Sequence, residues 1–151
     1  MAFSASSLLP RGVLLNRFLV GMIKVLLIED EEIIRLNLLN LLIDNGFNTL
    51  ITESQEMGIF VARELVPNVI LCNVNSKKVD AYKVLKQFRN DPVTARIPFI
   101  FISTQITQAE VPLGQRKGAD IYLTESFTSK EILQEIANLL ESESRLMHSS
   151  S

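Results

Sequence analysis

The chain has 151 residues, of which 47% are hydrophobic and 21% are charged, a composition typical of one globular domain and not of a disordered or fibrous protein. Its formal net charge of −2 does not indicate a nucleic-acid-binding protein. No apolar run reaches the roughly 18 residues that a membrane-spanning helix needs, so no membrane segment is predicted.

Residues 1–21 differ in composition from the rest, since they contain two arginines, several serines and no acidic residue. A targeting peptide and an amphipathic anchor both fit this composition. We expect instead a poorly ordered extension, such as one produced by an upstream start codon, with Met22 opening the domain. Without the two arginines the formal charge falls from −2 to −4, so the folded part is acidic.

Short apolar runs bounded by polar residues, proline or glycine predict five strands. They are Lys24–Ile28, a strand around Thr49–Ile51, a third that follows Pro67 and ends at Asn73, Pro98–Ile102, and Ile121–Leu123. The third is the most continuous, which favours a strand buried on both faces of a parallel sheet. It contains the single cysteine, Cys72, which we expect to be a small buried hydrophobic residue. Nothing indicates an oxidising compartment, and a cytoplasmic location is expected.

Helical patterns separate these strands. The first helix is predicted from Ile33 to Ile43 and ends at Asn45-Gly46, where glycine supplies a left-handed residue. Further along, Ser54 caps a helix that Pro67 stops. The remaining predictions are a helix marked by Tyr82, Val84, Leu85 and Phe88, a weak helix at about Gln108–Lys117 that contains Pro112 and Gly114, and a final helix with Ile132, Leu133, Ile136, Ala137 and Leu140 on its apolar face, begun by a capping box of Thr128 and Glu131.

Five alternations of strand and helix predict an α/β fold with a doubly wound parallel sheet and helices on both faces. We assign residues 22–143 to this one domain and residues 144–151 to a disordered tail.

Polar residues follow the predicted strands, at the edge of the sheet where ligands bind in open α/β folds. They are Glu29, Asp30, Asn73, Ser103, Thr104, Thr124 and Glu125. The set predicts a pocket with three carboxylates and no cation. A hydrolase using Ser103 is excluded because the only histidine, His148, falls in the predicted tail. A phosphate-cradling loop after the first strand is excluded because Asp30-Glu31-Glu32 has the wrong charge.

Five blocks in order also carry a family resemblance: Glu29-Asp30, Pro67–Val74, Val79–Leu85, Ile97–Ser103 and Gly118–Thr124. Through them, residues from about 23 to 140 resemble the receiver domain of two-component response regulators. The resemblance implies a flavodoxin-like fold with strand order 2-1-3-4-5.

The resemblance also implies roles for single residues. In the family an aspartate at the position of Asn73 accepts a phosphoryl group from a histidine kinase. The acidic pair, here Glu29 and Asp30, binds Mg²⁺ with the backbone carbonyl at Asn75. A hydroxyl at Ser103 and a lysine at the position of Glu125 bind the phosphoryl oxygens, and an aromatic residue at Tyr122 changes rotamer on activation. This chain matches at Glu29, Asp30, Ser103 and Tyr122 and departs at Asn73 and Glu125.

Both departures oppose phosphorylation. A carboxamide oxygen is a poor nucleophile, so Asn73 cannot form the ordinary acyl phosphate. Glu125 places a negative charge where the family has ammonium, and repulsion of a phosphoryl group at about 4 Å would be on the order of several kcal/mol. Two explanations stay open: the site has drifted after losing its use, or a hydrogen bond between Asn73 and Glu125 locks one state.

We therefore expect a non-enzymatic, single-domain receiver that serves as a phosphorylation-independent interaction module. The alternative is an active phosphorelay receiver that uses Mg²⁺ and an unusual acceptor such as Ser103 or Thr104. No cofactor is required, although weak Mg²⁺ binding at Glu29, Asp30 and Asn75 is expected. The expected partner is a histidine kinase or downstream effector, bound at the face of the fourth helix, fifth strand and fifth helix. Neither nucleic acid nor membrane is expected, and the oligomeric state is left open.

Overall fold

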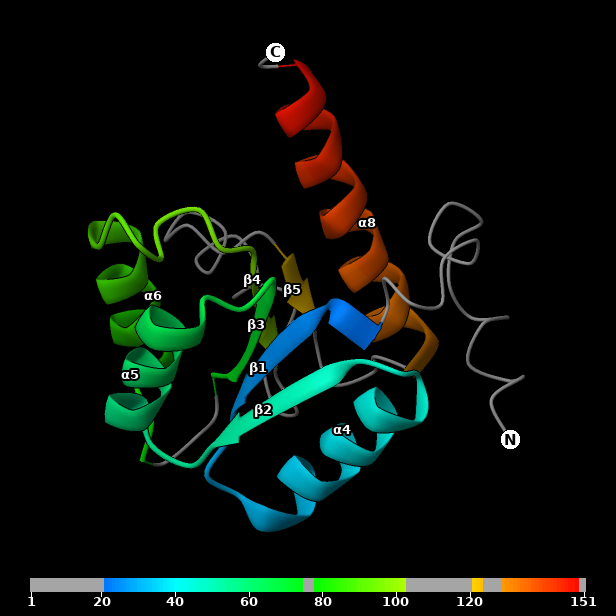
Figure 1. Ribbon diagram of the computed structural model, residues 1–151. Helices are drawn as coiled ribbons and strands as arrows, with labels where there is room; N and C mark the ends of the chain where they lie inside the picture. Colours follow the sequence, from blue (N-terminus) through cyan, green and yellow to red (C-terminus); the bar gives the residue numbers. More distant parts are fainter. Residues whose placement is uncertain (1–20, 75–77, 103–120, 124–128, 150–151) are drawn as a thin grey trace.

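Five parallel strands form the centre of the computed structural model, in the order β2-β1-β3-β4-β5 (Figure 1). Their bounds are β1 Lys24–Ile28, β2 Asn48–Thr52, β3 Val69–Asn73, β4 Phe99–Ile102 and β5 Ile121–Leu123. The structure describes residues 21–74, 78–102, 121–123 and 129–149. The predicted α/β class, strand positions and strand order are confirmed, with β4 beginning one residue after Pro98.

Helices cover both faces of this sheet, as predicted (Figure 1). Helices α4 (Glu32–Asp44) and α8 (Ser129–Ser149) lie on one face, and α5 (Gln55–Leu65) and α6 (Ala81–Asn90) lie on the other. Successive residues of a strand point to opposite faces. In β1, Val25 and Leu27 therefore pack with α4 and α8, while Leu26 and Ile28 pack with α5 and α6.

Local sequence signals set the helix ends. Ser54 Oγ accepts a hydrogen bond from the Met57 backbone N–H at 3.2 Å, which caps α5 as predicted. Asp80 Oδ1 caps α6 in the same way, accepting from Lys83 N at 3.1 Å. Gly46 has a φ of 87° just past α4, a conformation that glycine adopts without strain. The stop signal at Asn45-Gly46 is therefore confirmed.

The C-terminal helix differs from its prediction. Helix α8 runs to Ser149, so it passes the domain end placed at residue 143 and includes most of the segment 144–151 predicted to be a disordered tail. The physical reason is that residues 141–149 contain neither glycine nor proline to end the helix.

Several predicted elements lie outside the described residues: the extension at 1–20, the weak helix at 108–117, and Thr128 of the capping box. None of the described helices combines the length and apolarity that crossing a membrane would demand.

Candidate functional site

The carboxyl ends of β1 and β3 lie side by side and bring the central site residues together. Ile28 of β1 pairs with Cys72 of β3 in the parallel register. The next residues along the two strands, Glu29 and Asn73, are therefore neighbours at the same edge of the sheet. Both side chains are buried, with exposed fractions of 0% for Glu29 and 3% for Asn73. Asp30 follows Glu29 and is partly buried. The fold therefore brings Glu29, Asp30 and Asn73 to the same edge of the sheet.

Glu29 is the most enclosed ionisable group of this site. Its Oε1 accepts a hydrogen bond from the Glu31 backbone N–H at 3.0 Å, and its carboxylate is also hydrogen-bonded by the side chain of Asn73. Burial raises the pKa of Glu29 above its ordinary value, because desolvation disfavours the charged form. The two hydrogen bonds act in the opposite direction, and the nearby charges of Asp30 and Glu31 raise the pKa further.

Arg35 is a cation that the sequence analysis missed. Its Nη1 donates to the backbone carbonyl oxygens of Glu29 and Asp30, each at 3.2 Å, and its Nη2 lies 3.3 Å from Glu53 Oε1. A cation therefore lies beside the acidic residues that follow β1, although its contacts are with their backbone and with Glu53. Only polar residues that end strands were considered, whereas Arg35 lies in the first turn of α4. The sequence feature that could have indicated this contact is a basic residue in the first turn of the helix that follows the acidic end of β1. Helical side chains tilt toward the N-terminus of their helix, so such a residue can reach back to the segment between strand and helix.

The donor set fits a hard cation in part. Glu29 and Asp30 supply carboxylate oxygens, which Mg²⁺ prefers. Glu29 Oε2 is buried and makes no hydrogen bond within the described part of the chain. No cluster of three or more His, Cys, Asp and Glu residues suited to a metal occurs in that part. Weak Mg²⁺ binding at these residues therefore stays a prediction.

Other predicted site residues are placed less fully. Asn75, Ser103 and Glu125 lie outside the described residues, so the contact between Asn73 and Glu125 stays a prediction. Tyr122 lies on β5, in register with Phe101 of β4. Asn73 pairs in register with Ile102, the residue that precedes Ser103 in the chain.

Cys72 is fully buried between these elements, and burial raises the pKa of its thiol. A buried thiol that stays protonated is neither a nucleophile nor a metal ligand. The prediction of a small buried hydrophobic residue is confirmed.

Comparisons with known proteins agree on one family. The family model of the response regulator receiver domain matches residues 25–137. Protein PilH of Pseudomonas aeruginosa is 26% identical over 119 residues, which are 79% of this chain and 98% of PilH. The phosphate regulon transcriptional regulatory protein PhoB of Escherichia coli is 26% identical over 113 residues, which are 75% of this chain and 49% of PhoB. Histidine kinase P4 of Formosa agariphila is 26% identical over 122 residues, and this chain spans 9% of its length.

Solved structures show the same fold. A response regulator receiver domain protein from Clostridium thermocellum has a TM-score of 0.74 at 22% identity, covering 82% of this chain and 98% of that one. The chemotaxis protein CheY4 of Vibrio cholerae has a TM-score of 0.71 at 21% identity, covering 78% and 98%.

Proposed function

The chain belongs to the response regulator receiver domain family, and from that premise we propose that it binds its signalling partner without being phosphorylated. Receiver domains act in two-component systems, where they interact with histidine kinases and effectors. The proposal concerns how this receiver operates within such a system and assigns it no catalytic activity of its own.

The observation that carries the proposal is the environment of Asn73. The residue lies at the carboxyl end of β3, where the family has its phosphoryl acceptor, and its buried amide is hydrogen-bonded to Glu29. Acyl phosphate formation needs a carboxylate oxygen as nucleophile, and an amide is not one at neutral pH.

Charge supports the same conclusion. Phosphoryl transfer depends on cations that offset charge on the phosphoryl oxygens. The sequence has Glu125 at the family's lysine position. Arg35 does not substitute for that lysine, because its guanidinium is held by two backbone carbonyls and by Glu53.

We further propose that Mg²⁺ binds weakly at Glu29 and Asp30, with Asn75 as a third ligand, and is not required for function. A bound divalent cation would offset the mutual repulsion of the acidic pair. The proposed partner surface includes β5 and α8, the counterparts of the family's fifth strand and fifth helix, together with the family's fourth helix, whose counterpart at residues 108–117 lies outside the described residues.

Intact-mass measurement after incubation with acetyl phosphate and Mg²⁺ tests the proposal. We expect no stable phosphoryl adduct on the wild-type chain. The double variant Asn73→Asp with Glu125→Lys restores both missing groups and serves as the reference for an adduct. A stable adduct on the wild type would overturn the proposal. If peptide mapping placed it on Ser103 or Thr104, the chain would be an active phosphorelay receiver with an unusual acceptor.

A pull-down from cells of the source organism, with the wild type and the same double variant as baits, tests phosphorylation independence. An unchanged set of captured proteins is the expected result. Capture of the physiological partner by the double variant alone would contradict the proposal, because binding would then need the restored acceptor.

A further inference from the structure

Basic residues concentrate in one stretch of this acidic chain. Residues 77–96 hold six of the 15 Lys and Arg residues and only two acidic residues, Asp80 and Asp91. Six positive and two negative charges give the stretch a formal charge of +4, whereas the whole chain carries −2, so the other residues together carry −6. The excess of positive charge in this chain is therefore concentrated in residues 77–96.

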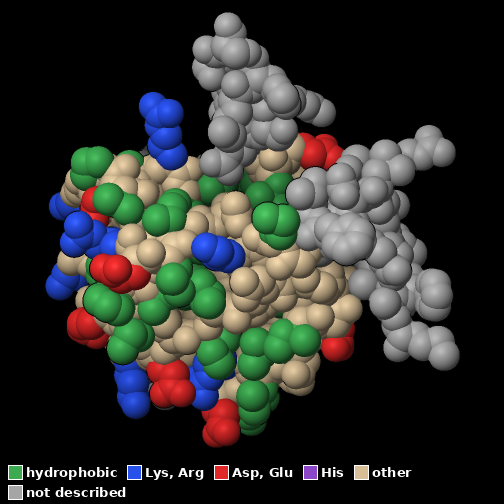
Figure 2. Space-filling view, viewed as in Figure 1, with side chains coloured by type: hydrophobic (Ala, Val, Ile, Leu, Met, Phe, Trp, Pro, Cys, Tyr) green, Lys and Arg blue, Asp and Glu red, His purple; other side chains and the backbone are tan. Residues whose placement is uncertain are grey.

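Helix α6 presents much of this charge to solvent. The helix buries Val84, Leu85 and Phe88 against the sheet and exposes Lys83 and Lys86, which are one turn apart. Lys and Arg side chains lie along the edge of the molecule formed by α5 and α6, interspersed with Asp and Glu side chains (Figure 2).

The two acids of the stretch are already engaged in the fold. Asp91 forms a 2.8 Å ion pair with Arg63 of α5, and Asp80 caps α6 through the Lys83 backbone N–H. They therefore offset the lysine charges of this face only in part.

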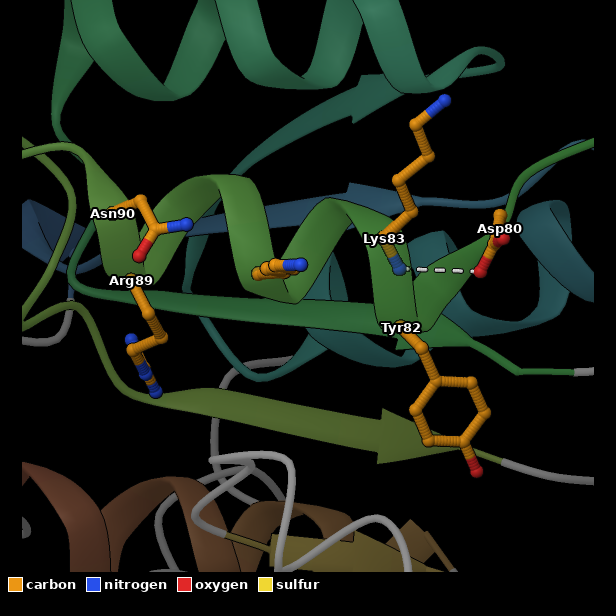
Figure 3. Close-up of a pocket in the computed structure, with 6 residues that line it drawn as sticks. Asp80, Tyr82, Lys83, Arg89 and Asn90 are labelled. Atoms are coloured by element: carbon orange, nitrogen blue, oxygen red, sulfur yellow. Dashed lines mark hydrogen bonds between the residues drawn. The ribbon is translucent and has the colours of Figure 1, made fainter.

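A cavity of about 760 Å³ lies along the same helix. In the described part of the chain it is lined by Asp80, Tyr82, Lys83, Lys86, Arg89 and Asn90 (Figure 3). Figure 3 shows Tyr82 and Arg89 toward opposite ends of α6. The cavity thus combines cationic groups with an aromatic ring.

Two of the lining side chains are held in place. The Tyr82 ring packs edge-on against Phe101 of β4, with ring centroids 4.9 Å apart. Arg89 Nη1 donates to the backbone carbonyls of Ala95 at 3.1 Å and Ile97 at 2.8 Å. Tyr82 and Arg89 therefore lose little conformational entropy when a ligand binds.

We propose that this cavity and the exposed lysines of α6 bind an acidic peptide segment of a partner protein. Carboxylates of the segment pair with Lys83 and Lys86, and an apolar side chain of the segment packs on the Tyr82 ring. A nucleic acid fits less well, because the charge of −6 on the rest of the chain repels an extended phosphate backbone. The proposal does not depend on whether position 73 accepts a phosphoryl group.

Titration of the ¹⁵N-labelled full chain by NMR tests this site. The probe is a short glutamate-rich peptide with one central phenylalanine, and its control has glutamine in place of every glutamate. We expect chemical-shift changes at α6 and Tyr82 with the acidic probe, little change with the glutamine peptide, and weakening at high salt. Absence of changes at α6, or stronger changes elsewhere, would overturn the proposal.

A matched pair of variants separates a local site from a net-charge effect. Lys86→Glu and Lys130→Glu each reverse one exposed helical lysine, on α6 and α8 respectively. We expect Lys86→Glu to weaken peptide binding by about tenfold and Lys130→Glu by less than about twofold. Equal weakening by both variants would overturn the assignment to α6. Tighter binding of a single-stranded oligonucleotide than of the peptide, with the same dependence on Lys86, would overturn the choice of ligand.

Discussion

The side chain of Asn73 hydrogen-bonds to the carboxylate of Glu29 at the carboxyl edge of the sheet, so an amide at the end of β3 is a partner for a buried carboxylate at the end of β1. A buried carboxylate is costly unless it is hydrogen-bonded, and an amide supplies a donor that an aspartate at neutral pH lacks. The Asn73 amide therefore lowers the cost of burying the Glu29 carboxylate.

Replacing Asn73 by aspartate is expected to destabilise the fold when divalent cations are absent. Asn73→Asp removes the donor to Glu29 and places a second buried carboxylate beside it, so we expect a loss of about 1–3 kcal/mol in the free energy of unfolding at neutral pH. Urea denaturation in EDTA measures this, and Asn73→Ala, which removes the donor without adding charge, should lose less. Added Mg²⁺ should stabilise Asn73→Asp more than the wild type. An aspartate variant as stable as the wild type in EDTA would show that the Asn73–Glu29 contact has no energetic weight.

The raised pKa of Glu29 predicts a specific pH dependence. A carboxyl group whose pKa is higher in the folded state than in the unfolded state contributes stability at low pH and loses it as pH rises through the folded pKa. Glu29→Gln keeps an oxygen acceptor and removes the charge, so we expect it to be more stable than the wild type at neutral pH. The difference should shrink as pH falls through the Glu29 pKa. Denaturation of both proteins between pH 4 and 8 (about the range that a raised glutamate pKa covers) checks this, and a difference independent of pH would contradict it.

Arg35 is expected to contribute more to the free energy of unfolding than Arg63, although the ion pair of Arg63 with Asp91 is shorter. Its side chain is 12% exposed and bonds to two backbone carbonyls, whereas the Arg63 side chain is 58% exposed and pairs with Asp91 at 2.8 Å. We expect Arg35→Ala to cost about 1–3 kcal/mol of unfolding free energy and Arg63→Ala about 0–1 kcal/mol. Chemical denaturation of the two variants in parallel decides the order. A larger loss in Arg63→Ala would mean that the contacts of Arg35 do not stabilise the loop after β1.

Gly58 is expected to be sensitive to the smallest substitution. A Cβ at this position would lie 2.7 Å from Ile28 Cδ1 and 3.0 Å from Ile28 Cγ1, and Ile28 is fully buried. Overpacking of a core costs about 1–3 kcal/mol, which exceeds the roughly 1 kcal/mol that alanine gains over glycine in a helix. We expect Gly58→Ala to destabilise the protein on balance, as measured by thermal or urea unfolding.

A double-mutant cycle with Ile28→Val tests the cause of that loss. Valine lacks the Cδ1 atom, so Ile28→Val should cost less in the Gly58→Ala background than in the wild type. Additive effects would show that the contact between residues 28 and 58 is not the source.

The strands and most helix ends were predictable because their signals are local. An apolar run after Pro67 predicted β3, and Ser54 and Gly46 marked helix ends through side-chain capping and a left-handed backbone, which depend on a few neighbouring residues. The C-terminal end of α8 was not predicted, because residues 144–151 were expected to form a disordered tail, whereas the helix continues to Ser149.

The candidate site also has a part that the sequence predicted and a part that it did not. Parallel strands end at one edge of their sheet, so a strand assignment suffices to bring Glu29 and Asn73 together. Arg35 could not be predicted by that route, since its contacts depend on the angle at which α4 leaves β1. That angle is set by the packing of Leu38 and Leu42 on the sheet.

By itself, the sequence determined the fold class, the strand order through its family resemblance, and an amide at the end of the third strand. These features follow from the periodicity of hydrophobic residues, from the turn residues that end strands and helices, and from side-chain chemistry. Only the tertiary structure decided that Asn73 is buried against Glu29, that Arg35 holds the carbonyls beside the acidic pair, and that the basic residues of α6 border a cavity with Tyr82. Such relationships join elements distant in the chain, and the docking of helices on the sheet produces them.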